Sequence, residues 1–202
     1  MIVVGLTGGI ATGKSTTSTI FREMNIPVHD ADATVHGLMA PNGPATTAIV
    51  ARFGAEVIAA DGSVDRQALG KTVFGDDELR RDLEAILHPL VAADRDQFLA
   101  QHRQAGAAVV VLDVPLLFET GGDSLCDLTI LCVVDPQIQR DRAMQRPGMT
   151  ADKLDGIIAS QMPMAEKIER ADCVINTDGG VDAARADLLQ ILGDHVDPAN
   201  HP

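Results

Sequence analysis

The residues with the clearest chemical meaning form a glycine-rich segment near the start of the chain. Gly8-Gly9-Ile10-Ala11-Thr12-Gly13-Lys14-Ser15 fits the pattern G-x-x-x-x-G-K-[ST], between an apolar run and a helical pattern. Glycines in this pattern let successive backbone amides converge on a phosphate, and the following helix adds its positive end. Lys14 is therefore expected to neutralise the β- and γ-phosphates of ATP, and the Ser15 hydroxyl to bind Mg²⁺.

Two aspartates, Asp30 and Asp32, follow the second apolar run and are two residues apart. In a kinase of small molecules, a carboxylate at this place can accept the proton of the acceptor hydroxyl and orient its oxygen for in-line attack. Alternatively, one of the two caps the amino end of a helix over 33–39. The residues alone leave both interpretations open.

A third aspartate, Asp113, follows a run of four apolar residues. At the end of a strand, an acid in a protein with this glycine-rich pattern can lie near the water shell of Mg²⁺. The alternative is a solvated strand end.

Three arginines follow Asp135-Pro136, a pair that is typical of a helix start. They are Arg140, Arg142 and Arg146, and the last two, four residues apart, are predicted to share a helix face. In an acidic chain such a pair can close over a polyphosphate and stabilise charge in the transition state. A solvated helix face is the alternative.

His88 and Gly179-Gly180 give weaker signals. His88 precedes Pro89 between two helical runs, which favours a helix-start residue over an acid–base catalyst. The two glycines follow the last apolar run. They could shape a loop against adenine, and an ordinary strand-to-helix turn explains them as well.

Short β-branched apolar runs alternate with longer helical patterns, which indicates a parallel α/β fold. We expect strands at about 2–6, 26–29, 109–112, 128–134 and 173–175, and a helix at about 14–24. A last helix carries an apolar stripe, is capped by Gly193 and leaves a frayed tail over 194–202. The stripe consists of Val181, Ala184, Leu188 and Leu192.

The stretch from about Asp32 to His102 is mostly helical in pattern and too long for a simple crossover between strands. We therefore expect a helical insertion. Asp61-Gly62 predicts a turn inside it, and Asp76-Asp77-Glu78 predicts a helix start.

Composition and charge restrict the partners. The 202 residues carry a formal net charge of −13 and include no Trp or Tyr, which argues against binding nucleic acid on a basic surface or on aromatic platforms. The three cysteines, Cys126, Cys132 and Cys173, are scattered, so neither a disulfide framework nor a zinc site is predicted. No segment approaches a membrane span, and we expect a cytoplasmic protein.

Over nearly its whole length the chain resembles the dephospho-CoA kinase family. Many families share the glycine-rich segment, whereas the D-A-D, H-P and P-L-L-F-E segments, in this order and spacing, are more particular. The segments that carry the resemblance are Leu6–Thr16, Asp30-Ala31-Asp32, Ala60-Asp61-Gly62, Asp65-Arg66, Ile86-Leu87-His88-Pro89, Val114-Pro115-Leu116-Leu117-Phe118-Glu119, Gln145-Arg146, Gln161, Lys167 and Ala171-Asp172-Cys173-Val174-Ile175-Asn176.

The resemblance implies a three-layer P-loop fold with a five-stranded parallel sheet, a helical insertion and a helical lid. The nucleotide-binding core would be 1–31, 105–135 and 171–193, the helical substrate domain 32–104, and the lid 136–170. The implied reaction, with Mg²⁺, transfers the γ-phosphate of ATP to the 3′-hydroxyl of dephospho-CoA, giving CoA and ADP in the last step of coenzyme A biosynthesis.

The resemblance also implies roles for single residues. Asp32 is similar to the family's proposed base, and Arg142 lies where the family places a phosphate-contacting arginine, so that both join Lys14 as catalytic residues. ATP contacts are implied at Gly8, Gly9, Ala11, Thr12, Gly13, Lys14, Ser15, Thr16, Arg146, Asn176 and Gly179, and acceptor contacts at Thr7, Asp32, His88, Pro115 and Leu116.

The chain departs from the family pattern at two places. Ala11 stands where the family often has Gly, and Arg146-Pro147-Gly148-Met149 interrupts the lid more sharply than usual.

Two other functions share the glycine-rich segment. One is a kinase of a nucleoside monophosphate or a sugar acid, against which the D-A-D and P-L-L-F-E segments weigh. The other is a nucleotide switch. A GTPase is expected to carry Asn-Lys-x-Asp for guanine, and Asn176-Thr177-Asp178 lacks that lysine.

Overall fold

The computed structural model describes residues 1–196, which form two compact units. Unit 1 is Met1–His29 together with the chain from His102 onward, and unit 2 is Asp30–Gln101. The bounds of unit 2 are close to those of the predicted insertion, 32–104. Because unit 1 includes residues 136–170, a lid that moves separately stays a prediction.

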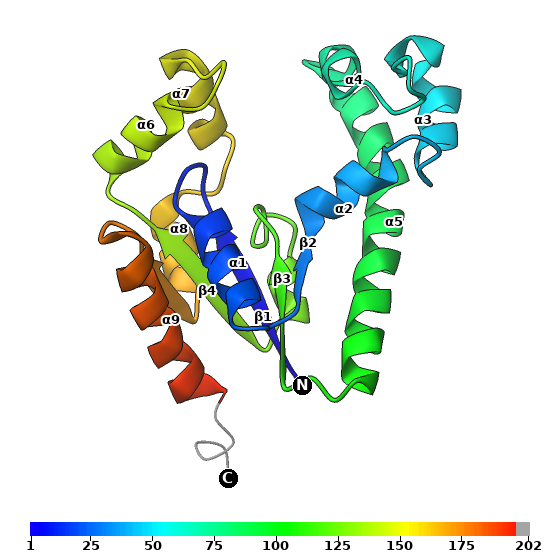
Figure 1. Cartoon of the computed structure of the whole chain (residues 1–202). Helices are drawn as coiled ribbons and strands as arrows, with labels where there is room; N and C mark the ends of the chain where they lie inside the picture. Colours follow the sequence, from blue (N-terminus) through cyan, green and yellow to red (C-terminus); the bar gives the residue numbers. More distant parts are fainter. Residues whose placement is uncertain (197–202) are drawn as a thin grey trace. The chain divides into compact units, whose positions relative to one another are not determined.

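Unit 1 is built on a five-stranded parallel sheet with the order β2-β3-β1-β4-β5 (Figure 1). Central β1 pairs with β3 on one side and β4 on the other, and Thr7 and Gly8 extend it beyond the predicted end by pairing with Leu131 and Cys132. The strands are β1 (Ile2–Gly8), β2 (Val28–Asp30), β3 (Val109–Asp113), β4 (Leu128–Val133) and β5 (Cys173–Asn176).

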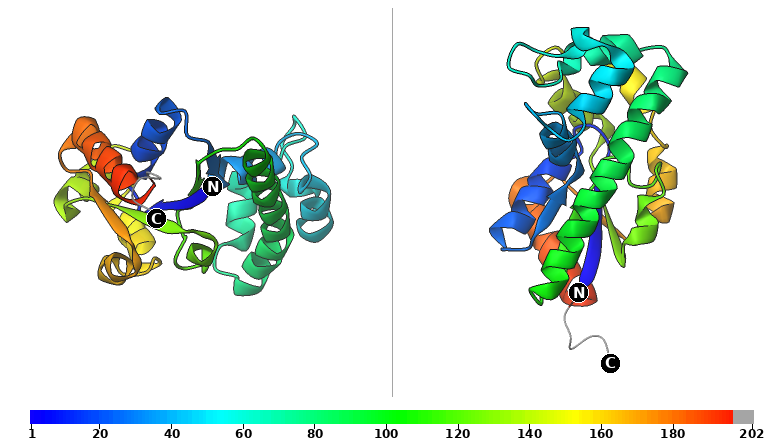
Figure 2. Two further views of the ribbon diagram at one scale, coloured as in Figure 1. Left: turned by 90° about the horizontal axis from the view of Figure 1, so that it is seen from below. Right: turned by 90° about the vertical axis from the view of Figure 1, so that its right-hand side faces the viewer.

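The two faces of the sheet are covered by different segments, because alternate residues of a strand point to opposite faces. Val4 and Leu6 of β1 pack with α1 (Lys14–Glu23) and α9 (Gly180–His195). α8 (Met164–Arg170) lies on the opposite face (Figures 1 and 2). On that face a Cβ at Gly5 would lie only 2.8 Å from the Leu117 side chain. The absence of a side chain at Gly5 therefore lets the segment that follows β3 pack against β1.

The last helix differs from the prediction at both ends. Ala184 and Leu188 are buried, as the stripe predicts, but Val181 is 50% exposed in the first turn of α9. The helix also continues through Gly193 to His195, since Gly193 does not adopt the positive φ of a glycine cap. The predicted end of the helix is therefore wrong, and the rest of the predicted tail, 197–202, lies outside the described residues.

Unit 2 is helical and has its own core. Its helices are α2 (Ala31–Leu38), α3 (Thr46–Phe53), the 3₁₀ helix Ala55–Val57, α4 (Arg66–Val73) and α5 (Asp77–Gln104). The turn at Asp61-Gly62 is confirmed by a φ of 85° at Gly62. Helix α5 begins at Asp77, as predicted, and Asp76 accepts hydrogen bonds from the amides of Glu78 and Leu79. The buried core consists of Leu38, Met39, Ala45, Ile49, Phe53, Val57, Val64 and Leu69.

The predicted break at His88-Pro89 is wrong, because α5 is one continuous helix with Pro89 inside it (Figure 2). Proline removes a single backbone donor and usually kinks a helix. Apolar residues on both sides of Pro89 nevertheless pack against the core of unit 2, and this packing outweighs the local preference. They are Leu79, Leu83, Ile86, Leu87, Leu90 and Val91.

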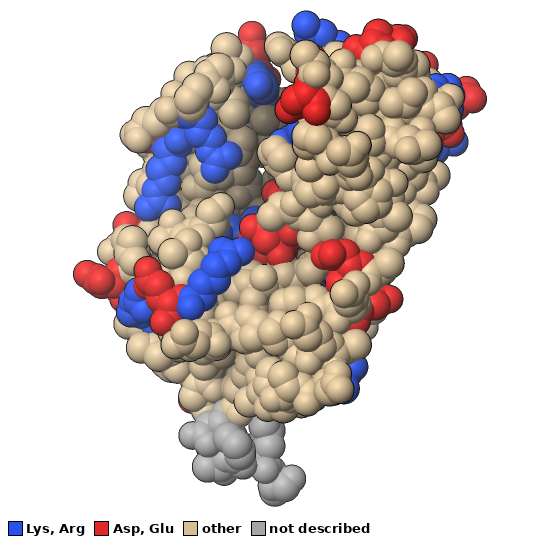
Figure 3. All heavy atoms as spheres, turned by 45° about the vertical axis from the view of Figure 1, so that its right-hand side comes forward, with Lys and Arg blue, Asp and Glu red and all other residues tan. Residues whose placement is uncertain are grey.

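Charged side chains of both signs are interspersed over the face shown in Figure 3, and neither sign covers it. Within residues 1–196 no helix has the length and apolar character that a membrane span requires.

Candidate active site

The glycine-rich loop joins β1 to α1 at the carboxyl edge of the sheet in unit 1. Thr12 closes the loop, since its amide and its Oγ1 both donate hydrogen bonds to the Gly9 carbonyl, at 3.3 and 2.9 Å. Gly13 has a φ of 92°, and a Cβ there would lie 2.8 Å from Thr177. Only glycine fits at this position. The amides at the start of α1 are a ready site for a phosphate.

Ala11 also has a left-handed backbone, with a φ of 59°, which strains any residue except glycine. Its methyl group packs with Ala143 of α6 (Pro136–Met144) and Leu154 of α7 (Ala151–Ala159). Glycine, which the family often has at this position, could not make this methyl contact. The contact connects the loop to both helices of the predicted lid.

Lys14 forms an ion pair with Asp113 at the end of β3. The Asp113 side chain is only 2% exposed, so the alternative of a solvated strand end is wrong. The structure thus brings together the predicted phosphate lysine and the predicted acid near Mg²⁺. Ser15 is exposed in the first turn of α1, next to Lys14 in the chain.

A buried thiol lies behind the loop. Cys132 of β4 donates a hydrogen bond to Thr17 Oγ1 at 3.4 Å, and burial raises the pKa of the thiol to about 11. The thiol therefore stays protonated near neutral pH and does not act as a nucleophile.

Arg142 is held beside the loop by Thr177, the residue after β5. Arg142 Nη1 donates to Thr177 Oγ1 at 3.0 Å and Nη2 donates to the Thr177 carbonyl at 2.9 Å. Thr177 Oγ1 in turn donates to the Thr12 carbonyl at 2.9 Å. The alternative of a solvated helix face is therefore wrong for Arg142. Sequence reasoning missed Thr177, for which no local pattern gave a signal.

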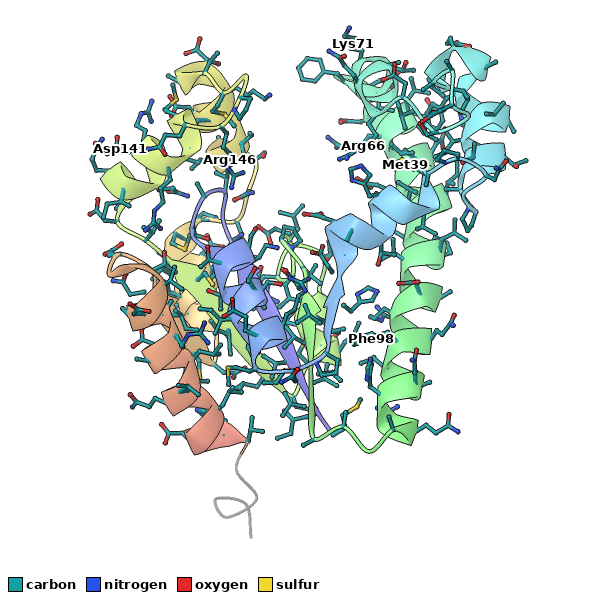
Figure 4. All side chains as sticks on the ribbon, in the orientation of Figure 1. Met39, Arg66, Lys71, Phe98, Asp141 and Arg146 are labelled. Carbon is teal, nitrogen blue, oxygen red and sulfur yellow. The ribbon has the colours of Figure 1, made fainter. Side chains whose placement is uncertain are left out.

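Arg146 does not share a helix face with Arg142, so this prediction is wrong. Helix α6 begins with the predicted Asp135 cap and ends at Met144, and Arg146 follows it (Figure 4). Pro147 cannot donate the next helical hydrogen bond, and Gly148 has a φ of 71°, so the chain turns there. Arg146 is exposed.

The residues expected near adenine lie at the end of β5 and in the turn that follows it. Asn176 Oδ1 accepts a hydrogen bond from the Asp178 amide at 2.7 Å, and Asp178 Oδ1 accepts one from the Asp135 amide at 2.7 Å. Gly179 is the residue that precedes α9. The turn therefore joins the start of α6 to the start of α9, and its contact with adenine stays a prediction.

On the opposite side of the loop, Thr7 and Pro115 are in contact. Thr7 is fully buried, and its Oγ1 donates to the Pro115 carbonyl at 3.1 Å. Leu116 is 40% exposed at the same segment. Among the residues of unit 1 that are predicted to contact dephospho-CoA, Leu116 is thus the most exposed.

The remaining predicted residues belong to unit 2. Asp30 Oδ1 accepts a hydrogen bond from the Ala33 amide at 3.0 Å and is the cap of α2. Asp32 lies exposed in the first turn of α2. The cap alternative therefore applies to Asp30, and the role of Asp32 stays a prediction. His88 is exposed on α5.

Known proteins resemble this chain over most of its length. The family model described as dephospho-CoA kinase matches residues 2–183. A dephospho-CoA kinase from Mesorhizobium japonicum is 49% identical over 192 residues, which cover 95% of this chain and 95% of that protein. The crystal structure of TT1252 from Thermus thermophilus superposes with a TM-score of 0.81 and 30% identity, over 96% of this chain and 97% of that one. A dephospho-CoA kinase from Campylobacter jejuni shares the fold, with a TM-score of 0.71, 23% identity and 98% of each chain covered.

Proposed function

The chain belongs to the dephospho-CoA kinase family, and on this basis we propose that it phosphorylates the ribose 3′-hydroxyl of dephospho-CoA with ATP, using Lys14, Asp32 and Arg142. The observation that carries the assignment of Lys14 is its contact with the buried Asp113 beside the glycine-rich loop. A cytoplasmic location and the lack of a nucleic-acid partner stay expectations.

The loop and the start of α1 would hold the phosphates of ATP. Backbone amides and the helix terminus attract negative charge, and Lys14 would exchange the carboxylate of Asp113 for the β- and γ-phosphates. The loose transition state of phosphoryl transfer spreads negative charge over the transferred group, so positioning and electrostatics supply most of the catalysis.

Mg²⁺ fits the donors in this region. Ser15 offers a hydroxyl, and Asp113 a buried carboxylate that could act through water. No group of three or more His, Cys, Asp and Glu residues suited to a metal occurs within residues 1–196, which agrees with an ion held largely by water and substrate phosphates. The ion would neutralise charge on the β- and γ-phosphates.

Two further side chains complete the proposal. Arg142 is held beside Thr12 of the loop through Thr177, and its guanidinium would contact the transferred phosphoryl group. Arg146, beyond the end of α6, is the second candidate for a phosphate contact. Asp32 would accept the proton of the 3′-hydroxyl and orient its oxygen for in-line attack.

We expect ATP and dephospho-CoA to protect different segments from amide hydrogen exchange. A non-hydrolysable ATP analogue should slow exchange in residues 8–16 and in α6 and α7, because the loop and lid would order around it. Dephospho-CoA should slow exchange in the helices of unit 2. Exchange that neither ligand changes would contradict the proposed sites, and protection of the loop alone would contradict a nucleotide-dependent lid.

A further inference from the structure

The ion pair between the buried Lys167 and the partly buried Glu119 lies in unit 1 and is not used by the reaction as described. The Lys167 side chain, on α8, is 1% exposed, and its Nζ lies 2.7 Å from Glu119 Oε1. The contact is an ion pair rather than a well-aligned hydrogen bond, and the buried Glu119 Oε2 has no hydrogen-bond partner within residues 1–196. Burying such a pair is a poor way to gain stability, because desolvation opposes the attraction of the charges.

The carboxylate of Glu119 also holds a turn. Its Oε1 accepts a hydrogen bond from the Met162 amide at 3.0 Å, and Met162 lies in the turn 160–163 between α7 and α8. Lys167 and Met162 therefore converge on one oxygen. Burial opposes ionisation of Glu119, but the contacts of Lys167, of its own backbone amide and of the Met162 amide outweigh burial and lower its pKa. The carboxylate is thus charged near neutral pH.

The same turn lies against the glycine-rich loop. A Cβ at Gly9 would lie 3.3 Å from Gln161 Oε1 and 3.5 Å from Met164 Cε, so residues on both sides of Met162 border Gly9. Gln139 Nε2 of α6 donates to the Ile10 carbonyl at 2.8 Å, which fixes the next residue of the loop. The position of Gly9 therefore depends on where the turn is held.

We propose that Glu119 is a positioning residue for ATP: by accepting the hydrogen bond of the Met162 amide, it holds the turn 160–163 against Gly9 and so keeps the loop amides aligned for phosphate. This rests on the proposed function of the loop. A loop that is already aligned loses less conformational entropy when ATP binds, so the affinity for ATP is higher. Loss of the alignment should therefore weaken the binding of ATP and leave the binding of dephospho-CoA unchanged.

Two double variants separate positioning from stability. Glu119→Gln/Lys167→Met and Glu119→Leu/Lys167→Met both remove the two charges of the pair, so neither leaves one charge unpaired. Glutamine can still accept the Met162 hydrogen bond, whereas leucine leaves that amide without its acceptor. We expect the KM for ATP to rise about tenfold in the leucine variant and less than about threefold in the glutamine variant. The KM for dephospho-CoA should stay near the parent value in both.

Equal KM values for ATP in the two double variants would overturn the proposal and leave the pair a structural role. Asp123→Asn is the matched control, because Asp123 binds Arg170 of the same helix α8 without touching the turn, and it should leave the KM for ATP unchanged. If the leucine variant does not fold, Met162→Pro removes the same donor while keeping both charges, and a parent KM for ATP in that variant also overturns the proposal. Failure of the proposed function differs, since the parent would then transfer no phosphate to dephospho-CoA.

Discussion

Replacing Lys14 with Ala is expected to lower kcat/KM about 10²–10³-fold, because one charged contact to the developing transition state is lost. The structure adds an effect on stability. Since Asp113 is buried and paired with Lys14, the single variant leaves a buried carboxylate without its cation and should melt several degrees below the parent.

Lys14→Ala/Asp113→Asn is the control for this effect. Removing the charge of Asp113 should restore much of the melting temperature, which would assign the instability of Lys14→Ala to the unpaired buried carboxylate. Steady-state kinetics and thermal melting of the three proteins make the comparison. Near-parent turnover of Lys14→Ala would contradict the role of Lys14.

Replacing Asp32 with Asn is expected to lower kcat about 10²–10⁴-fold, the usual contribution of general base catalysis. The fall should lie toward the low end of this range, because the hydroxyl proton leaves late in phosphoryl transfer. The KM for ATP should change little. Stability should also be nearly unchanged, since Asp30 rather than Asp32 caps α2.

Asp30→Asn is the matched control, because Asn caps a helix as well as Asp does and the capping hydrogen bond is retained. Its effect on kcat should be smaller than that of Asp32→Asn. If Asp30→Asn is inactive and Asp32→Asn turns over like the parent, the base is Asp30. If both variants are fully active, neither aspartate acts as the base.

Features set by neighbouring residues could be predicted from the sequence. The glycine-rich loop needs a local pattern with a strand before it and a helix after it, and both are present. The start of α6 needs only Asp135 and Pro136, and Asp135 does accept hydrogen bonds from the Gln137 and Ile138 amides. Four of the five strands were recognisable as short apolar runs, whereas β2, Val28–Asp30, begins two residues later than the strand predicted at 26–29 and includes His29 and Asp30.

Features set by distant residues could not be predicted in this way. Pro89 alone predicts a helix break, but the packing of apolar residues along both halves of α5 keeps the helix continuous. The spacing of Arg142 and Arg146 suits a helix that in fact ends between them.

The contacts within the site join segments that only the fold brings together. Lys14 and Asp113 are 99 positions apart, and Arg142 and Thr177 are 35 apart. No periodicity in the sequence predicts such contacts, because they form only when the parallel strands end at the same edge of the sheet.

The most direct test of the proposed reaction is to follow ADP release with dephospho-CoA, adenosine, nucleoside monophosphates and gluconate as acceptors, and to locate the new phosphate by ³¹P NMR. We predict that dephospho-CoA gives the highest kcat/KM, that ADP forms in step with its consumption, and that the phosphate is attached to the ribose 3′-oxygen. A higher kcat/KM for another acceptor, phosphate at the 2′-oxygen, or ADP release without phosphorylated product would contradict the assignment.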